Sequence, residues 1–439
     1  MGAQMERLTT RRNLLRTAAG GSALLLARNA TSRPRGANDR INTGVVGLGG
    51  RGTYLLSLAL HRADERSDVQ VVALCDVYQK RLNAARERAH ARGHEPKLYA
   101  LHQELLDHKD LDAVIIATPD HWHAPVTLMA MEHGLDVYCE KPMTHTVEEA
   151  RQVARKSREL NRVVQIGVQG TSWTRWHKVR EIVQSGLLGK VVAAQGTYSR
   201  NDPRGDWNWP IDAGAGPNAK GELHIDWKQW LGLAPERAFD ADRFFRFRKY
   251  WDYSGGIATD LHYHIVAPFH VALENEHPTR ISGMGGLYVY NDGREVPDTF
   301  LNSADYPGKY NITVVSSQVN EIGPPMVLRG TEATLHLGDE WEGPQGRDID
   351  YARIVPDTPF KKDFMKKTGK DEIIVTGVGN EGDQKHMDNF MDCIRSRQQP
   401  NCHADMGYKV MTHIDLAVRS YREGKMYHFD AKDERAFAG

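Results

Sequence analysis

The sequence has few of the features that mark metal-binding, disulfide-bonded or nucleic-acid-binding proteins. Its only cysteines are Cys75, Cys139, Cys393 and Cys402, and no CxxC pair occurs, which argues against a structural zinc or a redox pair. No block of Lys or Arg beyond the first 40 residues is dense enough to neutralise a run of phosphates. With 57 basic and 57 acidic residues the net charge is zero, so no nucleic-acid partner is predicted.

The chain also has no internal repeats, and its composition is that of an ordinary globular protein with 40% hydrophobic residues. At 439 residues it is longer than one core usually organises, so we expect two domains. Composition shifts around Gln165–Gln169. We therefore predict a nucleotide-binding domain over residues 39–165 and a substrate-binding and oligomerisation domain over residues 166–439, including the C-terminal helices.

Residues 1–38 are predicted to be an export signal and a linker. Arg11 and Arg12 stand directly before a small-residue apolar run that is too short to span a bilayer, a pattern that resembles a twin-arginine signal. The alternative is a basic tail with an amphipathic helix. Ser32–Asn38 is typical of a polar linker. Such signals direct folded proteins out of the cytoplasm, so we expect a periplasmic or otherwise exported protein without a stable membrane span.

A glycine-rich turn follows the first predicted strand. Ile41–Gly47 runs into GLGGRG at Gly47–Gly52, and a helical pattern follows at Tyr54–Ala63. In a dinucleotide site the first glycine permits the tight turn, the second admits a pyrophosphate, and the third lets helix and strand pack closely. A glycine-rich turn can also be only a turn. The motif nevertheless predicts phosphates at the helix N-terminus.

The second strand, Val69–Cys75, ends on Asp76. A carboxylate at this place accepts hydrogen bonds from a ribose and repels a 2′-phosphate. We therefore predict NAD as the cofactor, with NADP less favoured. Arg81 could lie near the ribose, which leaves NADP open.

Two further parallel strands are predicted at Ala113–Ala117 and in the DVYC sequence, joined by a helix at Pro125–Gly134. Their ends, at Thr118–His123 and at Glu140–Lys141, should meet at one edge of the sheet, where ligands of open α/β sheets bind. A lysine there is a candidate for chemistry. Two histidines in the polar loop could ligate a metal, but no cysteine or carboxylate cluster completes a ligand set, and we predict no metal site.

The second domain is predicted to contain a large, mostly antiparallel sheet covered on one face. Consecutive strands without intervening helices exclude a simple continuation of the first domain. These strands are predicted at Val191–Ser199, Ile281–Tyr290, Thr299–Ala304, Tyr310–Val319 and Ala333–Leu337, and helices at Asp383–Arg397 and Tyr408–Glu423. Residues 340–381 are charged and irregular and support no prediction.

Aromatic residues are dense after the domain boundary, and several lie in the loop-like sequence of Arg200–Pro217. Core packing is the commoner role of an aromatic side chain, but such rings also stack on sugars. We predict substrate contacts from six residues: Trp122, Gln169, Tyr198, Trp207, Trp209 and His262.

The stretch Ser254–His264 carries a second candidate for chemistry. If a helix begins near Gly256, Asp260 and His264 fall at i and i+4 on one face, and His262 points elsewhere. A carboxylate beside a histidine raises its basicity, as a proton-transferring base requires. A capping aspartate and a satisfied histidine would be the structural alternative.

Together these motifs resemble the glucose-fructose oxidoreductase/inositol dehydrogenase (Gfo/Idh/MocA) family. They are the glycine turn, Asp76, Thr118-Pro119 with His123, Glu140-Lys141-Pro142, the Asp260 and His264 pattern, and the closing HMDNFMDCIRSRQQP at His386–Pro400. The resemblance implies an α/β fold with an N-terminal Rossmann domain and a C-terminal α/β domain whose large, mostly antiparallel open sheet serves substrate binding and homo-oligomer contacts.

By the same resemblance the catalytic group is Lys141, Asp260 and His264. The cofactor-binding residues are Gly47, Leu48, Gly49, Gly50, Arg51, Gly52, Asp76, Thr118, Pro119, His121, His123, Glu140 and Lys141. The segment GVQGTSW lacks the arginine-aromatic pair of relatives, and His262 adds a second histidine. Both departures leave the substrate open.

Three functions are consistent with this pattern. The first is an exported NAD-dependent dehydrogenase that oxidises a ring hydroxyl of a glycoside or disaccharide, with His264 as base and cationic Lys141 stabilising the oxyanion. The second is a glycoside hydrolase that uses NAD transiently, through oxidation, elimination and return of the hydride. The third is an inactive cofactor-binding protein, which the intact Lys141, Asp260 and His264 disfavour.

Overall fold

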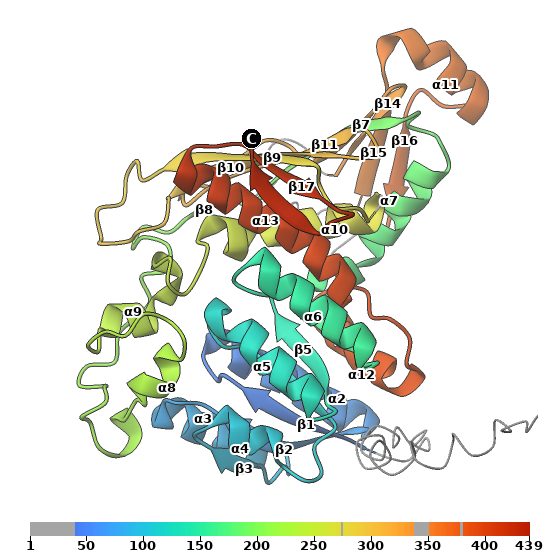
Figure 1. The fold of residues 1–439 in the computed structure, drawn as a ribbon. Helices are drawn as coiled ribbons and strands as arrows, with labels where there is room; N and C mark the ends of the chain where they lie inside the picture. The colour runs from blue at the N-terminus through green and yellow to red at the C-terminus, as the bar shows by residue number, and fades with distance from the viewer. Residues whose placement is uncertain (1–39, 274, 338–350, 378–380) are drawn as a thin grey trace, which may run out of the picture. The chain divides into compact units, whose positions relative to one another are not determined.

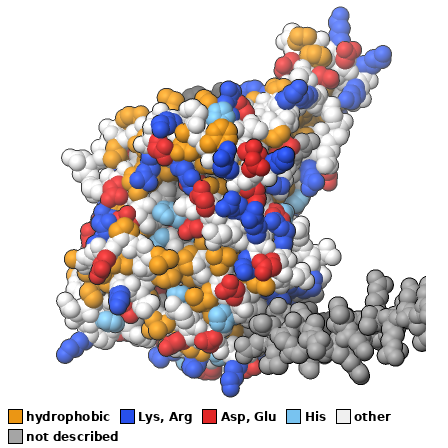
Figure 2. Space-filling view, viewed as in Figure 1, with side chains coloured by type: hydrophobic (Ala, Val, Ile, Leu, Met, Phe, Trp, Pro, Cys, Tyr) orange, Lys and Arg blue, Asp and Glu red, His pale blue; other side chains and the backbone are white. Residues whose placement is uncertain are grey.

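The computed structural model describes residues 40–273, 275–337, 351–377 and 381–439 (Figure 1). The predicted export signal and linker, residues 1–38, lie outside these residues. None of the helices in the described ranges is long and apolar enough to cross a membrane. On the face shown in Figure 2, basic and acidic side chains are interspersed, as the balanced composition predicts.

The first sheet is a Rossmann-type parallel sheet of six strands in the order β3-β2-β1-β4-β5-β6. The order reverses between β1 and β4, and ligands of such sheets bind at this switch point, outside the carboxyl ends of the strands. The strands are β1 Ile41–Val46, β2 Val69–Cys75, β3 Lys97–Tyr99, β4 Ala113–Ile116, β5 Asp136–Glu140 and β6 Val164–Gly167. The helices between them are α2 Gly50–Arg66, α3 Gln79–His90, α4 His102–Leu106, α5 Asp120–Glu132 and α6 Val147–Glu159.

Helix α5 begins at Asp120, whereas the sequence predicted a start at Pro125, so the predicted polar loop shrinks to Thr118 and Pro119. Pro119 is extended, at φ −61° and ψ 157°, and ends the strand-to-helix turn. Asp120 then stands in the first turn, where a carboxylate interacts favourably with the helix dipole. Pro125 is tolerated inside the helix. As a result, His121, Trp122 and His123 project from the first turns of a helix.

The second sheet has ten strands in the order β16-β15-β14-β13-β7-β11-β10-β9-β17-β18. All of its neighbouring strands are antiparallel except β7 and β11, which are parallel. Burial alternates residue by residue along β10 and β11, so one face is covered. The strands are β7 Val191–Thr197, β9 Arg280–Gly286, β10 Thr299–Tyr306, β11 Tyr310–Ser317, β13 Val327–Gly330, β14 Ala333–His336, β15 Tyr351–Pro356, β16 Ile373–Thr376, β17 Tyr427–Asp430 and β18 Arg435–Ala438. This architecture confirms the predicted fold class.

Helices pack on one face of the second sheet, as Figure 1 shows for α10 and α13. Helices α10 Tyr263–Ala272 and α13 Ala404–Glu423 contact the strands, and α7 Thr174–Gln184 packs on α10. Strands β15 and β16 flank α11 Lys361–Thr368, in the region where the sequence supported no prediction. A short ladder also joins β8 Arg200–Asn201 to β12 Val319–Asn320.

Helix α12, Gln384–Ser396, completes the core of the first domain although it comes near the end of the chain. Its side chains Met387 and Phe390 are fully buried in the same cluster as Leu55 and Leu56 of α2. Arg62, only 1% exposed, donates to Asp68 at 2.6 Å and to Asp392 at 2.6 Å. A helix near the C-terminus therefore completes the core of the Rossmann domain.

An aromatic cluster joins the two domains beside the switch point. It contains Tyr78 of the loop after β2 and rings from residues 227–253, which carry α8 Trp227–Leu231 and α9 Ala241–Phe245. Backbone bonds tie the segment to that loop, from Asp226 N to Val77 O at 2.9 Å and from Gln79 N to His224 O at 3.2 Å. The members of the cluster are Tyr78, Ala215, Ile225, Trp227, Trp230, Leu231, Phe244, Phe245, Tyr250 and Tyr253.

Candidate functional site

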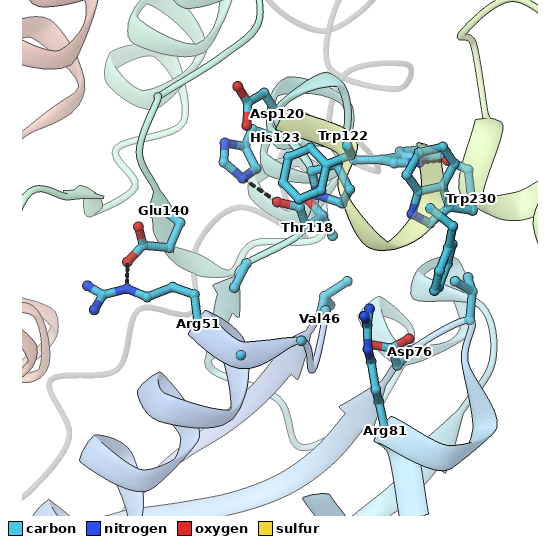
Figure 3. A pocket seen from close by; sticks show the side chains of 18 of the residues that line it. Val46, Arg51, Asp76, Arg81, Thr118, Asp120, Trp122, His123, Glu140 and Trp230 are labelled. Atoms are coloured by element: carbon cyan, nitrogen blue, oxygen red, sulfur yellow. Dashed lines mark hydrogen bonds and ion pairs between the residues drawn. The ribbon is translucent and has the colours of Figure 1, made fainter. Parts of the chain in front are cut away.

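A cavity of about 430 Å³ lies at the carboxyl ends of β1, β2, β4 and β5 (Figure 3). One wall is the glycine turn, Asp76 and the ends of β4 and β5. The opposite wall comes from the second domain, with Trp209, Trp230 and Arg248. This volume is in the range of small-molecule and cofactor sites.

The glycine turn has the conformation that a dinucleotide site requires. Gly47 has φ +85°, and a Cβ there would lie 2.7 Å from Ala117 O. A Cβ at Gly52 would lie 1.8 Å from Gly47 O, so only glycine lets α2 pack this closely on β1. At Gly50 nothing lies within 4 Å of the Cβ position. The turn is therefore closely packed at Gly47 and Gly52, and it is open at Gly50, which lines the cavity.

The residues around the turn fit an anionic dinucleotide. Helix α2 begins at Gly50 with no acidic residue in its first turn, and its free N–H groups form an anion site. Two polar atoms of cavity-lining residues, Arg51 Nη2 and Thr118 Oγ1, are buried without a hydrogen-bond partner in the described part of the chain. Buried polar groups are usually paired, so a ligand bearing oxygen atoms would satisfy both.

Asp76 and Arg81 stand side by side at one end of the cavity (Figure 3). Asp76 Oδ2 accepts from Leu48 N at 2.6 Å, and Oδ1 accepts from Tyr78 N at 2.8 Å. Burial raises the pKa of Asp76, against the opposing effects of Arg81 and these two N–H groups. The Arg81 guanidinium lies 5.1 Å from the Phe244 ring centre and 5.5 Å from that of Tyr78. The pair offers an acceptor for ribose hydroxyls and a donor for a phosphate.

Lys141 and Asp260, from different domains, meet at the other end of the cavity. Lys141 Nζ donates to Asp260 Oδ1 at 2.5 Å and to Asp260 O at 2.8 Å. Asp260 Oδ1 also accepts from Arg248 Nε at 2.9 Å, and Oδ2 accepts from Trp207 Nε1 at 3.1 Å. Burial alone would raise the pKa of Asp260, but Lys141 and Arg248 hold it well below its usual range. Asp260 is therefore an anion that fixes the lysine.

His264 lies beside this pair but is not hydrogen-bonded to it. Its ring centre is 5.7 Å from that of Tyr198, and its nitrogens have no hydrogen bond within the described ranges. Burial and the charge of Lys141 lower the pKa of His264 well below its usual value, so the imidazole is neutral. The expected Asp260–His264 hydrogen bond is thus absent, because Asp260 turns to Lys141, Arg248 and Trp207.

The reason is local backbone geometry. Residues Ala258–His262 form a π-helical turn before α10 begins at Tyr263. A π-turn shifts the register from that of an α-helix, and such turns are frequent at functional sites. The i,i+4 geometry assumed from the sequence therefore does not hold, and neither His264 nor Asp260 is among the described residues that line the cavity, whereas Lys141 is.

His123 links the end of β4 to the Lys141-Pro142 turn. Its Nδ1 lies 2.5 Å from Pro142 O and its Nε2 lies 2.9 Å from Thr118 O. Burial lowers the pKa of His123, but Cys139, Asp120 and the Pro142 carbonyl together raise it to about 9. Only the doubly protonated ring can donate to both carbonyls. His123 lines the cavity and holds the turn that carries Lys141.

Some of the remaining predicted cofactor residues line the cavity, and others hold the elements around it in place. Thr118, Pro119 and Glu140 line the cavity, and Glu140 Oε1 accepts from Arg51 Nε at 2.7 Å (Figure 3). Arg51 Nη1 also donates to Asp383 at 2.8 Å. His121 is not among the described residues that line the cavity. Its Nε2 lies 3.0 Å from Trp230 O, so it ties α5 to the aromatic cluster.

The predicted substrate residues also divide. Trp209, 42% exposed, and Trp122 line the cavity, and Trp122 Nε1 donates to Trp230 O at 2.7 Å. Trp207 is buried and donates a hydrogen bond to Asp260, and Tyr198 is buried with its ring next to that of His264.

Gln169 and His262 are not among the described residues that line the cavity. Gln169 Oε1 is buried without a partner in the described chain. His262 is fully buried, its Nδ1 lies 2.9 Å from Asn302 Nδ2, and its ring packs on Phe300. His262 therefore belongs to the core between the π-turn and the sheet, and not to the cavity wall that the predicted substrate contact requires.

Sequence reasoning missed Arg248 and Arg200. Arg248 contacts Asp260, and the charge of Arg200 also acts on it. The only signal was the alternation of aromatic and basic residues in FRFRKYWD, at Phe245–Asp252. No group of three or more His, Cys, Asp or Glu side chains in the described ranges is placed to hold a metal ion.

Two models of one protein family match the chain in succession. The model described as "Oxidoreductase family, NAD-binding Rossmann fold" matches residues 41–168, and the model described as "Oxidoreductase family, C-terminal alpha/beta domain" matches residues 173–283.

Curated relatives include two kinds of enzyme. A glycosyl hydrolase family 109 protein of Saccharopolyspora erythraea is 32% identical over 213 residues, which are 43% of this chain and 45% of that protein. An inositol 2-dehydrogenase of Rubrobacter xylanophilus is 32% identical over 172 residues, 38% of this chain and 46% of that protein. The chain therefore spans about half the length of these relatives.

Solved structures share the fold over most of the chain. A levoglucosan dehydrogenase in complex with NADH and levoglucosan has a TM-score of 0.64 at 17% identity, covering 91% of this chain and 99% of that one. An aldose-aldose oxidoreductase of Caulobacter crescentus, in complex with glycerol, has a TM-score of 0.64 at 18% identity, covering 88% and 99%.

Proposed function

We propose that this chain, which belongs to the Gfo/Idh/MocA oxidoreductase family, is a nicotinamide-dependent oxidoreductase that oxidises a ring hydroxyl of a sugar. The observation that carries the proposal is the meeting of Lys141 and Asp260 at the cavity edge, beside a neutral and unpaired His264. These three groups are what removal of a hydroxyl proton requires: a base, a cation for the oxyanion, and an anion that positions the cation.

The cofactor would be held by the glycine turn and Asp76 at one end and by Thr118 and Glu140 towards the other. When bound, its nicotinamide supplies the hydride acceptor. We propose NAD in preference to NADP, supported by the Asp76 carboxylate at the end of β2. Arg81 is the residue that would oppose this preference, because its guanidinium could pair with a 2′-phosphate.

The chain's own residues manage the proton. His264 accepts the proton of the sugar hydroxyl while the hydrogen on the same carbon leaves as hydride, so that a carbonyl forms. Lys141 donates a hydrogen bond to the oxygen as negative charge develops on it. Asp260 and His123 act as positioning residues, the former on the Lys141 ammonium and the latter on the turn that carries it.

A second candidate is an NAD-dependent glycoside hydrolase, favoured by the similarity to the glycosyl hydrolase family 109 protein. Oxidation acidifies the neighbouring C–H bond, the aglycone is eliminated, water adds, and the hydride returns. Purified protein incubated with a panel of glycosides separates the candidates. Net reduced nicotinamide supports the dehydrogenase, and sugar release without net redox change supports the hydrolase. If neither signal appears, the inactive cofactor-binding protein becomes the leading candidate.

We also propose that the protein is exported and forms a homo-oligomer through the open face of the ten-stranded sheet. The export proposal rests on the paired Arg11 and Arg12 before an apolar run. The oligomer proposal is supported by exposed apolar side chains at its β9 end, with Met284 62% and Tyr288 70% exposed. Fractionation of cells and light scattering of the purified protein test these two points, and a cytoplasmic monomer would contradict both.

A further inference from the structure

Arg248 projects into the cavity next to Lys141 with most of its hydrogen-bonding capacity unused. Its Nε donates to Asp260 Oδ1 at 2.9 Å, and its two terminal nitrogens have no hydrogen-bond partner in the described chain. The guanidinium lies 4.6 Å from the Phe247 ring centre and 5.3 Å from that of Trp209. An arginine held at Nε and flanked by rings presents the remaining edge of its fork in a fixed direction.

Arg248 lies among two other cations and three carboxylates. The Asp260 carboxylate is shared by Lys141 and Arg248, at 2.5 Å and 2.9 Å. A third cation, Arg200, acts on Asp260 through its charge and lies 3.8 Å from Asp206, while its Nη2 donates to the Tyr198 hydroxyl at 3.0 Å. The charge of Asp120, which lines the cavity, also acts on Arg248, so three cations face three carboxylates, but none of these carboxylates bonds the terminal nitrogens of Arg248 in the described chain.

The unbonded terminal nitrogens of Arg248 matter because the cations here are poorly solvated. The side chains of Lys141, Arg248 and Arg200 are 8%, 20% and 35% exposed. A charge removed from water without compensation is costly, whereas an anionic ligand would supply the missing partner. A neutral sugar would leave the terminal nitrogens of Arg248 without a charged partner.

We propose that the substrate is a sugar that carries a carboxylate, a uronic acid or its glycoside, and that Arg248 binds that carboxylate. The planar fork of the two terminal nitrogens matches the two oxygens of a carboxylate. Trp209, exposed on the same wall, supplies an apolar face for the sugar ring. This inference rests on the proposed function, since it names the substrate class of the same site.

The test compares matched substrates in the full-length protein supplied with NAD. The pairs are 4-nitrophenyl β-glucuronide with 4-nitrophenyl β-glucoside, and galacturonic acid with galactose. Nicotinamide reduction and nitrophenol release are both followed, so either reaction class is detected. We expect kcat/KM to favour the acidic member about 10- to 100-fold, the range of a hydrogen bond to a charged group. Arg248→Gln should abolish the preference, and Arg248→Lys should restore part of it.

Arg204→Gln is the control, because the Arg204 side chain is 76% exposed and is bonded only to Asp202 in the described structure. It should keep the wild-type preference. Equal or better use of the neutral sugars would overturn the substrate class and leave the proposed function standing. A preference that survives in Arg248→Gln would overturn the role of Arg248.

If no sugar of either kind is turned over, the proposed function fails, and calorimetric titration decides the inference separately. Binding of glucuronate to the protein with NAD, weakened about tenfold or more in Arg248→Gln but not in Arg204→Gln, supports a carboxylate site. Equal binding of glucuronate and glucose would reject it.

Discussion

The ammonium of Lys141 lies 2.5 Å from a carboxylate oxygen of Asp260, although 119 residues separate the two in the chain. One group ends a strand of the Rossmann sheet, and the other lies in a π-turn of the second domain. The pair exists only when both domains are folded against each other. The chemistry proposed here therefore depends on the interface between the domains, and several consequences can be measured.

Gly52→Ala should disrupt the packing of α2 on β1 at the glycine turn. The added Cβ would lie 1.8 Å from Gly47 O, a backbone atom that cannot move without shifting β1. We expect a loss of about 2–4 kcal/mol in the free energy of unfolding, measured by urea denaturation, together with loss of cofactor binding. Gly50→Ala is the matched control, because its Cβ meets nothing within 4 Å. Equal stability of the two variants would contradict the account.

Cofactor choice should respond to Asp76 and Arg81 in opposite directions. Removing the carboxylate in Asp76→Ala abolishes repulsion of a 2′-phosphate, so the ratio of kcat/KM for NADP to that for NAD should rise about tenfold or more. Arg81→Ala should lower the same ratio. Calorimetric Kd values for both dinucleotides provide the check. A ratio unchanged in Asp76→Ala would show that this residue does not select the cofactor.

The pH profile of kcat/KM should not show the ionisation of a histidine with an ordinary pKa. Burial and the charge of Lys141 lower the pKa of His264 well below its usual range. His264 should thus stay neutral and competent as a base when the pH falls through about 6.5, the value of an unperturbed histidine. Because kcat/KM reports on the free enzyme, its profile should be level there. A one-proton acid limb centred near that pH would count against His264 as the base.

His123 should stabilise the fold at low and neutral pH and lose this effect in alkali. Its pKa is raised to about 9 in the folded protein, against about 6.5 in the unfolded chain. A raised pKa contributes stability that is complete below the unfolded value and disappears as the pH rises through the folded value.

The stability difference between wild type and His123→Asn should therefore be largest below pH ~6.5 and shrink by roughly 3 kcal/mol as the pH passes ~9. Urea denaturation at a series of pH values measures it. A difference that stays constant across this range would mean that His123 is neutral in the folded protein. His133→Asn serves as the control, since His133 is partly exposed at the end of α5.

Much of the fold could be predicted because each Rossmann unit is specified locally. Val69–Cys75 agrees with the observed β2, since a short apolar run between turns favours a buried strand. Strands β15 and β16 could not be predicted, because they are short segments in charged, irregular sequence and depend on pairing with neighbouring strands of the sheet. The start of α5 was missed because Pro125 was taken as a first helical residue.

The site was predictable only in its parts. Lys141 and Asp260 could be identified from their motifs, and the structure brings them together. The separation of His264 from Asp260 could not, because it follows from the π-turn at Ala258–His262, which no local pattern announces. Arg248 was missed because its meaning depends on a contact with Asp260 across the fold.

The most direct test of the central claim is the turnover of Lys141→Met with a sugar that the wild type oxidises, measured together with cofactor binding. We expect kcat to fall at least ~10²- to 10³-fold, because the cation that stabilises the oxyanion is gone. The Kd for the dinucleotide should change little, and Lys220→Met, an exposed lysine, should behave as wild type. Turnover retained in Lys141→Met, with the cofactor bound, would contradict the claim.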